Sequence, residues 1–540
     1  MRRVPLWLCR LIVTGLVLAP LAAMGLGAVT DFGPNGSIRF TAFALALAGS
    51  DSSVREAIRN SLILATCVSL VATIVGSGLA RIVTSHRFRG RDVLCAISRA
   101  IGAVPPVFGA VGLVGLGWAA FPGEGRLRWL ALAWLHLAWA APRVMSAAVS
   151  SLERIPPSWR EAAEVAGASR SRSWWVASWP SARPRVARAV AGVFAVVLIE
   201  PTAPMVLGVR RSLGFTIVDA ALGNDGLGQA AALGMVSLVL AFVGRTLILW
   251  RGGPEWPLPT GFTVWRMPWA SWWSAMVSRL MLMLWIVVGG FPLVAMGITA
   301  FGFDRAGRFS LAGFGAILRD RESLAILADS AILGLVSTIL AIGLASGLGS
   351  RDPIGHVWRR PWLWISRVPA LLFGLGFLLL PRVLGAMAGR GSRVWGIAEG
   401  LDPYGSPWIL LSVCVALIHV PMIAKAFHET AMISNRGQEE VARSLGASSW
   451  IAWRAIRLPR IMMLWSGPLA WCFVLCALEA APAVLLSPTL AARPIIPAAL
   501  MIVKQPGGMQ RAAVLCTMAM VLPLAAGIMA RKRSTRDDRQ

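Results

Sequence analysis

The chain has 540 residues, of which 56% are hydrophobic and only 14% charged, and its mean hydropathy is +0.68. A soluble domain carries roughly 25% charged residues, so the composition excludes an ordinary soluble enzyme, and the apolar fraction is too high for a disordered chain. The formal net charge of +27 would suit a nucleic-acid-binding protein, but membrane proteins also gather basic residues on their cytoplasmic side. We therefore predict an all-α polytopic membrane protein.

Twelve segments are long and apolar enough for a membrane helix, which needs about 20 mostly apolar residues. They lie at about 7–29, 61–80, 94–120, 129–150, 186–208, 229–249, 274–300, 329–349, 362–384, 407–427, 467–488 and 511–530. The first resembles a secretory signal peptide because Arg2 and Arg3 precede it. We predict a retained anchor helix instead, because an equivalent span opens the second half.

Basic residues are concentrated in alternate connections between these spans. Arginines and lysines outnumber acids in 81–99, 143–188, 425–460 and 531–539, whereas basic and acidic residues are equal in number in 31–60 and 300–329. Because cytoplasmic connections carry the excess of Lys and Arg, we predict that the first four segments and both chain ends are cytoplasmic. The basic excess then needs no nucleic-acid partner.

The two halves of the chain overlay in the same orientation. Ser61 corresponds to Ser330 and Gly167 corresponds to Gly446, with one longer loop in the second half between these positions. Six spans per half is an even number, which predicts two parallel six-helix repeats. The predicted parts are an N-terminal anchor helix and outer loop, a first transmembrane module, a linker with the seventh helix and an outer loop, a second module, and a basic tail: 1–56, 57–250, 251–324, 325–531 and 532–540.

A short helix followed by a turn is predicted between the fourth and fifth spans of each half. We call these segments the first elbow (161–180) and the second elbow (440–459). An acid in the first turn suits the positive end of a helix dipole, and glycine at the end permits a left-handed residue. A proline then follows in each copy and is expected to break the chain before the next span begins. The pattern predicts an exposed cytoplasmic elbow joined to two membrane helices.

The elbows resemble the coupling loop of the integral-membrane subunits of ATP-binding-cassette importers. That motif reads Glu-Ala-Ala, three residues, Gly, nine residues, and Ile-any-Leu-Pro. The second elbow departs from it at Val441, and the first has Ala177 and Trp179 in place of Ile and Leu. The resemblance implies that the residues coupling the chain to an ATPase are Glu161, Ala162, Ala163, Gly167, Pro180, Glu440, Ala442, Gly446, Ile456, Leu458 and Pro459.

The resemblance covers most of the chain and is to fused permeases in which one polypeptide supplies both membrane halves, similar to ferric-iron and thiamine importers. It implies an inner-membrane transport subunit that works by alternating access with two copies of a separate ATPase subunit and an extracytoplasmic solute-binding protein. Ferric iron is the favoured solute, and thiamine or another small solute is the alternative. The sequence also indicates that another subunit hydrolyses ATP, because the phosphate-binding P-loop of an ATPase contains Gly-Lys. None of the three lysines follows a glycine: Lys425, Lys504 and Lys532.

Two acids lie at equivalent places inside or near the end of the fifth and eleventh spans, Glu200 and Glu479. An acid inside a membrane is costly and is a functional candidate by default. Prolines follow each acid, so the helix can break there and line a cavity. Two interpretations stay open: acids on the translocation path of a solute, or helix-end acids that are hydrogen-bonded within the bundle.

The sequence shows no catalytic residues, no metal ligands and no cofactor motif. None of the five histidines has a second His or Cys at metal-ligand spacing, and we predict that they pack in the bundle: His86, His136, His356, His419 and His428. Cys472 and Cys476 share a helix face in an apolar run and are also predicted to pack. Tyr404 is the only tyrosine, so a tyrosine-rich iron site would belong to a partner protein.

Two other classes of protein fit parts of the pattern. A gradient-driven carrier of the major facilitator type also has six plus six spans, and Gly90-Arg91 supplies part of its pattern between the second and third spans. It would leave the elbows unexplained. A membrane-embedded enzyme would need a polar catalytic cluster, which the sequence does not show.

Overall fold

The computed structural model describes most of the chain. The described residues are 6–32, 38–40, 51–117, 124–223, 226–253, 270–302, 309–348, 368–388, 392–402, 407–433, 436–487 and 493–523. Residues 254–269 of the predicted part 251–324, the basic tail, His356 and Tyr404 lie outside them.

The regular structure of the described residues is helical apart from one short hairpin. In that hairpin β1 (Thr30–Phe32) pairs antiparallel with β2 (Ile38–Phe40), and Asp31 lies opposite Arg39. The helices up to residue 252 are α1 (Leu6–Val29), α3 (Ser52–Ser85), α4 (Arg91–Ala103), α5 (Pro106–Gly115), α6 (Glu124–Leu152), α7 (Pro157–Val165), α8 (Arg170–Ser173), the π-helix η2 (Trp174–Ser178), α9 (Trp179–Ile199), α10 (Thr202–Leu207), α11 (Leu213–Leu222) and α12 (Leu227–Gly252). We call these helices the first set.

The second set of helices begins at residue 272. It consists of α13 (Trp272–Phe301), α14 (Ala312–Arg319), α15 (Arg321–Leu348), α17 (Ala370–Ala388), α18 (Arg393–Gly400), α19 (Pro407–Ile433), α20 (Arg436–Ser444), α21 (Ser449–Ala452), the π-helix η3 (Trp453–Arg457), α22 (Leu458–Ala477), α23 (Ala481–Leu486), α24 (Ile495–Val503) and α25 (Gly508–Ala519). Under the alignment that pairs Gly167 with Gly446, the helices α20, α21, η3, α22 and α23 begin at the positions equivalent to the starts of α7, α8, η2, α9 and α10.

Seven helices among the described residues are long and apolar enough to cross a membrane, or eight if one bent pair counts as a single span. The seven are α3, the continuous run Ser171–Leu207, α12, α13, α15, α17 and α19. The expectation of an all-α polytopic membrane protein is therefore confirmed. Large apolar side chains on the outer helix faces agree with a membrane location: Ile74 is 74% exposed and Val287 is 65% exposed. Exposing such side chains to water is unfavourable, whereas lipid would cover them.

Some of the predicted spans are not single straight helices. The third, 94–120, is the pair α4 and α5, which bend by 86° at a break. Pro105 and Pro106 lie at this break, where proline removes a backbone donor and clashes with the preceding turn. The eleventh, 467–488, is divided between α22 and α23, and α11 and α24 are short apolar helices that the sequence pattern did not predict.

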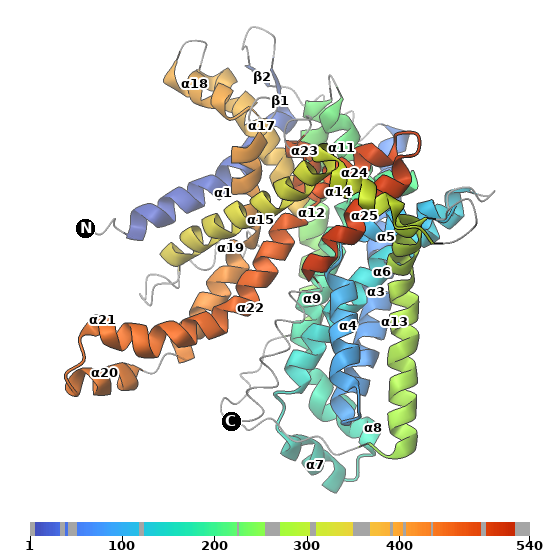
Figure 1. The fold of residues 1–540 in the computed structure, drawn as a ribbon, viewed down its shortest axis with the longest axis vertical. Coiled ribbons are helices and arrows are strands. Elements are labelled where there is room, and N and C mark those ends of the chain that lie inside the picture. The colour runs from blue at the N-terminus through green and yellow to red at the C-terminus, as the bar shows by residue number, and fades with distance from the viewer. Residues whose placement is uncertain are drawn as a thin grey trace.

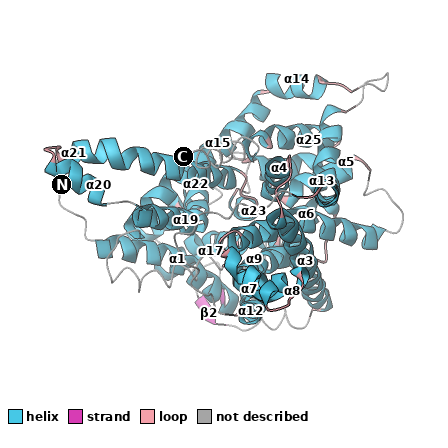
Figure 2. Ribbon diagram, turned by 90° about the horizontal axis from the view of Figure 1, so that it is seen from below, coloured by secondary structure: helices cyan, strands magenta, loops and turns pink. Residues whose placement is uncertain are grey.

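The helices form two diverging groups that meet at one end of the molecule (Figure 1). One group contains α3, α4, α6, α9 and α13, and the other contains α1, α15, α19 and α22. The elements α11, α23, α24 and α25 lie where the groups meet, and the view from below also shows α7 and α8 well apart from α20 and α21 (Figure 2). The two sets interlock, because α13 packs on α4 and α5 while α1 packs on α12 and α17.

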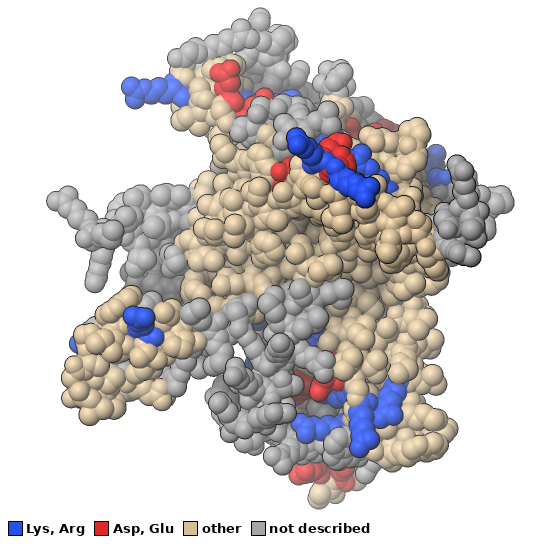
Figure 3. Space-filling view, in the orientation of Figure 1, with Lys and Arg blue, Asp and Glu red and all other residues tan. Residues whose placement is uncertain are grey.

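Charged residues avoid the middle of the molecule on the face drawn in Figure 3. Lysine, arginine and acidic side chains gather toward its two ends, and a broad band of other residues separates them (Figure 3). A bilayer with an apolar core about 30 Å thick would cover such a band.

Two buried serines satisfy the first backbone donors of the unexpected short helices. The N–H of Leu213, which begins α11, donates to Ser61 Oγ at 2.8 Å, and the N–H of Ile495, which begins α24, donates to Ser330 Oγ at 2.7 Å. The first N–H groups of a helix have no partner within the helix, so each serine fixes the start of one of these helices.

Close helix packing at Gly112 makes a testable prediction about stability. A Cβ at Gly112 on α5 would overlap the backbone of α13 at Pro292 and Met296, whereas a Cβ at Gly78 on α3 would meet no atom within 4 Å. Overpacking typically costs about 1–3 kcal/mol. We expect Gly112→Ala to lower the midpoint of thermal unfolding in detergent and Gly78→Ala to leave it unchanged or raise it. Equal midpoints for the two variants would contradict this packing.

Candidate functional site

Both elbows begin with a short helix that ends in the same hydrogen-bonded turn. After α7, Gly167 has φ of 88°, and its N–H donates to Glu164 O at 2.9 Å while the N–H of Ala168 donates to Ala163 O at 2.9 Å. This pair of bonds is a Schellman motif, in which a left-handed residue satisfies the last carbonyls of a helix.

The second elbow repeats the turn after α20. Gly446 has φ of 91°, its N–H donates to Arg443 O at 3.0 Å, and the N–H of Ala447 donates to Ala442 O at 3.0 Å. The expectation that a glycine ends each short helix in a left-handed conformation is confirmed for Gly167 and Gly446.

The expectation that proline breaks the chain before the next span is wrong at both elbows. Pro180 lies in the first turn of α9, and the helical run continues from Ser171 to Leu207. Pro459 likewise lies inside α22. A π-helical turn precedes each proline, η2 in the first elbow and η3 in the second. The wider turn accommodates the ring and the missing donor, so the helix after the glycine turn continues through the proline into α9 or α22 without a break.

Side-chain contacts hold the first elbow against the start of α9. Arg160 Nε donates to Ser178 Oγ at 2.6 Å, and the Ser173 hydroxyl donates to Glu164 Oε1 at 3.2 Å. The Arg81 guanidinium lies 5.0 Å from the centre of the Trp174 ring. Burial lowers the pKa of Arg160, and the Glu164 carboxylate opposes that shift, so the guanidinium stays charged at neutral pH.

Each elbow also presents large apolar side chains to solvent. Val165 and Trp175 of the first elbow are 89% and 54% exposed, and Leu445 and Trp450 of the second are 82% and 63% exposed. The acids and prolines named from the sequence are exposed as well: Glu161, Pro180, Glu440 and Pro459. Ala162 is exposed, whereas Ala163, Ala442, Ile456 and Leu458 are partly buried. Exposed apolar groups away from the lipid-facing band are typical of a protein docking surface.

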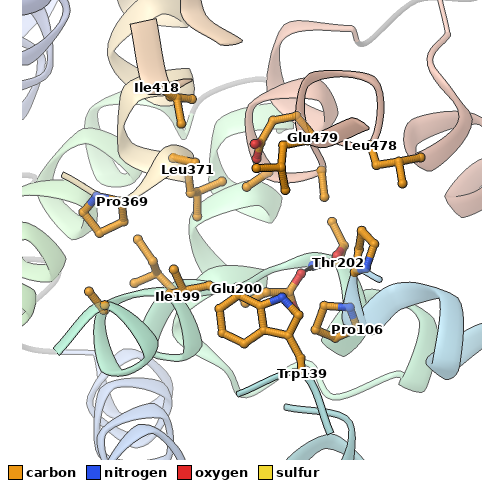
Figure 4. A pocket seen from close by; sticks show the side chains of 18 of the residues that line it. Pro106, Trp139, Ile199, Glu200, Thr202, Pro369, Leu371, Ile418, Leu478 and Glu479 are labelled. Atoms are coloured by element: carbon orange, nitrogen blue, oxygen red, sulfur yellow. Dashed lines mark hydrogen bonds between the residues drawn. The ribbon is translucent and has the colours of Figure 1, made fainter. Parts of the chain in front are cut away.

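The two acids Glu200 and Glu479 come together at one cavity of about 330 Å³. The lining comes from both sets of helices. Figure 4 shows Trp139, Glu200 and Thr202 of the first set facing Ile418 and Glu479 of the second. A cavity of this size is within the range of small-molecule sites.

Glu200 follows α9 and caps the short helix α10. Its Oε1 accepts the N–H of Thr202 at 2.8 Å, its Oε2 accepts the N–H of Ala203 at 3.1 Å, and the Thr202 hydroxyl also donates to Oε1. His136 Nε2 lies 3.7 Å from Oε2. Each oxygen of Glu200 therefore has partners within the bundle, which fits the helix-end interpretation of this acid.

Glu479 is held differently, although it occupies the equivalent position. His419 Nε2 lies 3.2 Å from its Oε2, and its side chain is 16% exposed compared with 9% for Glu200. No backbone N–H among the described residues is hydrogen-bonded to this carboxylate. Glu479 is therefore the more open of the two acids at the cavity.

His136 is buried, as predicted for the histidines, and His136 and His419 each also contact the acid of their own set. The position equivalent to His136 is Val415, and His419 follows it by about one helical turn. A histidine one turn away lies on the same helix face, and that signal could have identified the pairs.

The cysteines follow the expectation from the sequence. Cys472 and Cys476 are buried as predicted. No group of three or more His, Cys, Asp or Glu side chains in the described part of the chain could hold a metal ion.

Two arginines, Arg143 and Arg245, line the cavity, and the sequence pattern placed neither of them there. Arg143 falls in the basic segment 143–188 that was assigned to the cytoplasm, but the structure places it inside α6. Arg143 also belongs to the predicted span 129–150, and α6 covers that span and extends to Leu152.

The region 72–250 matches the family described as binding-protein-dependent transport system inner membrane component. The match includes the first elbow, Glu200 and most of the first set of helices. No curated protein matches the chain.

The different bonding of the two acids leads to a prediction about stability. Loss of a helix cap costs about 0.5–2 kcal/mol, so we expect Glu200→Ala to lower the thermal unfolding midpoint of the purified protein. Glu479→Ala removes no backbone cap and should lower the midpoint less. Thr202→Val, which keeps the backbone donor, is the control and should fall between wild type and Glu200→Ala. An equal or larger loss in Glu479→Ala would contradict the capping role of Glu200.

Proposed function

We propose that the whole chain is a fused permease of the ATP-binding-cassette importer type with two modules, the first of which contains the residues 72–250 that match the transport family. The second module would occupy 325–531. Its support is the recurrence, at equivalent positions of the second half, of the elbow helix, the Schellman glycine, the π-helical turn and the cavity acid.

We propose that each elbow binds one copy of a separate ATPase subunit. The exposed apolar side chains of the elbows, Val165 and Leu445 above all, would supply the contact. The single observation that carries the proposal is that both elbows have the same geometry, a short helix, a glycine turn and a helix that continues through a π-helical turn into α9 or α22. The first elbow continues through η2 and α9 as one helix to Glu200 at the cavity, so a displacement of the elbow reaches the cavity directly.

The proposed mechanism is alternating access through the cavity between the two sets. The helix groups diverge toward the elbows (Figure 1), which corresponds to a state open on the cytoplasmic side. Closure of an ATP-bound ATPase dimer would draw the elbows together and open the opposite end, where an extracytoplasmic binding protein would deliver solute. Hydrolysis would restore the arrangement seen here.

Ferric iron is the solute we favour, with thiamine or another small solute as the alternative. Two carboxylates at the cavity, Glu200 and Glu479, would suit a solute with a cationic part. A gradient-driven carrier of the major facilitator type would account for Gly90-Arg91 but not for the elbows or the family match.

The elbow glycines provide the first test of this function. A β-branched residue is strongly disfavoured at positive φ, so Gly167→Val and Gly446→Val should distort the elbows and lower ATP-dependent uptake by at least about 10-fold, since a left-handed residue alone costs about 1–2 kcal/mol. Gly117 has φ of 81° and open space around it, but lies outside both elbows. Gly117→Val is therefore the matched control and should keep near wild-type uptake. Normal uptake in both elbow variants, at normal membrane levels, would exclude the coupling role.

Cross-linking from the elbows tests the ATPase partner itself. Cysteines introduced as Glu161→Cys and Glu440→Cys should both be captured by the ATPase subunit when the complex is isolated from its native membrane. Both should also react with a membrane-impermeant thiol reagent only from the cytoplasmic side. Labelling of either position from the outside would overturn the topology, and failure of both to capture an ATPase would overturn the proposed function.

A further inference from the structure

Arg143 is a charged side chain inside the bundle that has no counter-ion in contact. It lies on α6 and lines the cavity. Its guanidinium stacks on the Trp139 ring at 4.1 Å, and its buried Nε has no hydrogen-bond partner. Within the part of the chain that the structure describes, Arg143 forms neither a hydrogen bond nor an ion pair.

This arrangement leaves the binding edge of the guanidinium open. Stacking on Trp139 occupies a face of the planar group, but its N–H donors point outward along the edges. Glu479 lines the same cavity and acts on Arg143 through space, without an ion pair. An ionised side chain inside a membrane protein is costly unless it is paired and is a functional candidate by default. The N–H groups along the edge of the Arg143 guanidinium therefore indicate that a ligand binds there.

The charges around the cavity also argue against a bare cation as its only occupant. The described lining contains two guanidiniums, Arg143 and Arg245, and two carboxylates, Glu200 and Glu479. These formal charges cancel. Moreover, Glu200 already accepts hydrogen bonds from the backbone of α10. A site for a free multivalent cation would need an excess of open carboxylates.

The charges are unevenly divided between the two sets of helices. The first set supplies both arginines and the acid that is used as a helix cap. The second set supplies Glu479 with His419, and the residue equivalent to Arg143 in the second half is Met422. The cavity therefore has a guanidinium that is open for an anion on one side and an open carboxylate on the other, so it is complementary to a solute that carries both signs of charge.

We propose that the solute crosses the membrane with an anionic oxygen group, a carboxylate or a phosphate, that binds to Arg143. Glu479 and His419 then face its cationic part. This inference rests on the proposed function and narrows its solute class to a metal ion chelated by anionic oxygen ligands or an organic cation bearing such a group. Arginine suits either anion, because its planar fork binds carboxylate and phosphate oxygens with two parallel hydrogen bonds.

The test uses the purified full-length chain in detergent, without an ATPase, and measures binding of paired probes at constant ionic strength. One pair is thiamine monophosphate and thiamine, and the other is ferric citrate and citrate alone. We expect wild type to bind thiamine monophosphate more tightly than thiamine, or to bind one of the two citrate probes. Preference for ferric citrate over citrate would identify the chelated metal as the source of the anionic group, and preference for thiamine monophosphate would identify the organic cation.

The variants then assign the binding to Arg143. Arg143→Met should weaken binding of the anionic probe by about 10- to 100-fold, the loss expected for hydrogen bonds to a charged group. Arg143→Lys keeps the positive charge but cannot form two parallel hydrogen bonds, so its loss of affinity should be intermediate. This graded effect would distinguish a lost contact from a folding defect in the Met variant. Arg279 on α13 is the control, because it is partly buried but donates to Arg89 O, and Arg279→Met should bind as wild type does.

Each outcome of the test is decisive. The inference is overturned if wild type neither prefers thiamine monophosphate to thiamine nor binds a citrate probe, or if both Arg143 variants bind the anionic probe as wild type does. Capture of the ATPase from Glu161→Cys and Glu440→Cys is measured separately. If the elbow cysteines capture the ATPase but the Arg143 variants bind the anionic probe as tightly as wild type does, this inference is rejected and the proposed function stands. If neither cysteine captures the ATPase, the proposed function itself is rejected.

Discussion

The structure depends on satisfying backbone donors wherever a helix breaks inside the bundle. In a bilayer no water is present to bond a free N–H group, so protein side chains must do so. Glu200 supplies this bond for α10, and Ser61 and Ser330 supply it for α11 and α24. These bonds satisfy the first donors of three short helices, of which α10 begins at the cavity with Thr202.

The same requirement explains why two acids at equivalent positions have different roles. The carboxylate of Glu200 is used by the backbone of α10, whereas Glu479 has His419 as its contact and remains more open. Under the proposed function, Glu200 serves the architecture of the bundle and Glu479 is left for a ligand. The unequal partners also give the cavity an uneven charge distribution, to which Arg143 and Arg245 contribute from one side only.

Mechanical continuity connects the elbows to the cavity. A Schellman turn orients each elbow helix, and the π-helical turn after it allows a proline to lie in the helix without breaking it. The elbow side chains Arg160 and Glu164 bond to the residues that precede α9. These bonds hold the first elbow against the start of α9, and coupling to an ATPase, as proposed, would require such a firm connection.

The sequence by itself determined the membrane class, most of the spans and the elbows, because apolar length and the φ preference of Gly167 and Gly446 are local properties. It also placed Glu200 and Glu479 at equivalent positions. Only the tertiary structure decided that both acids line one cavity, that His136 and His419 contact them, and that Arg143 lies inside the bundle. Those facts depend on how helices far apart in the chain pack and rotate, and no local pattern of residues encodes that arrangement.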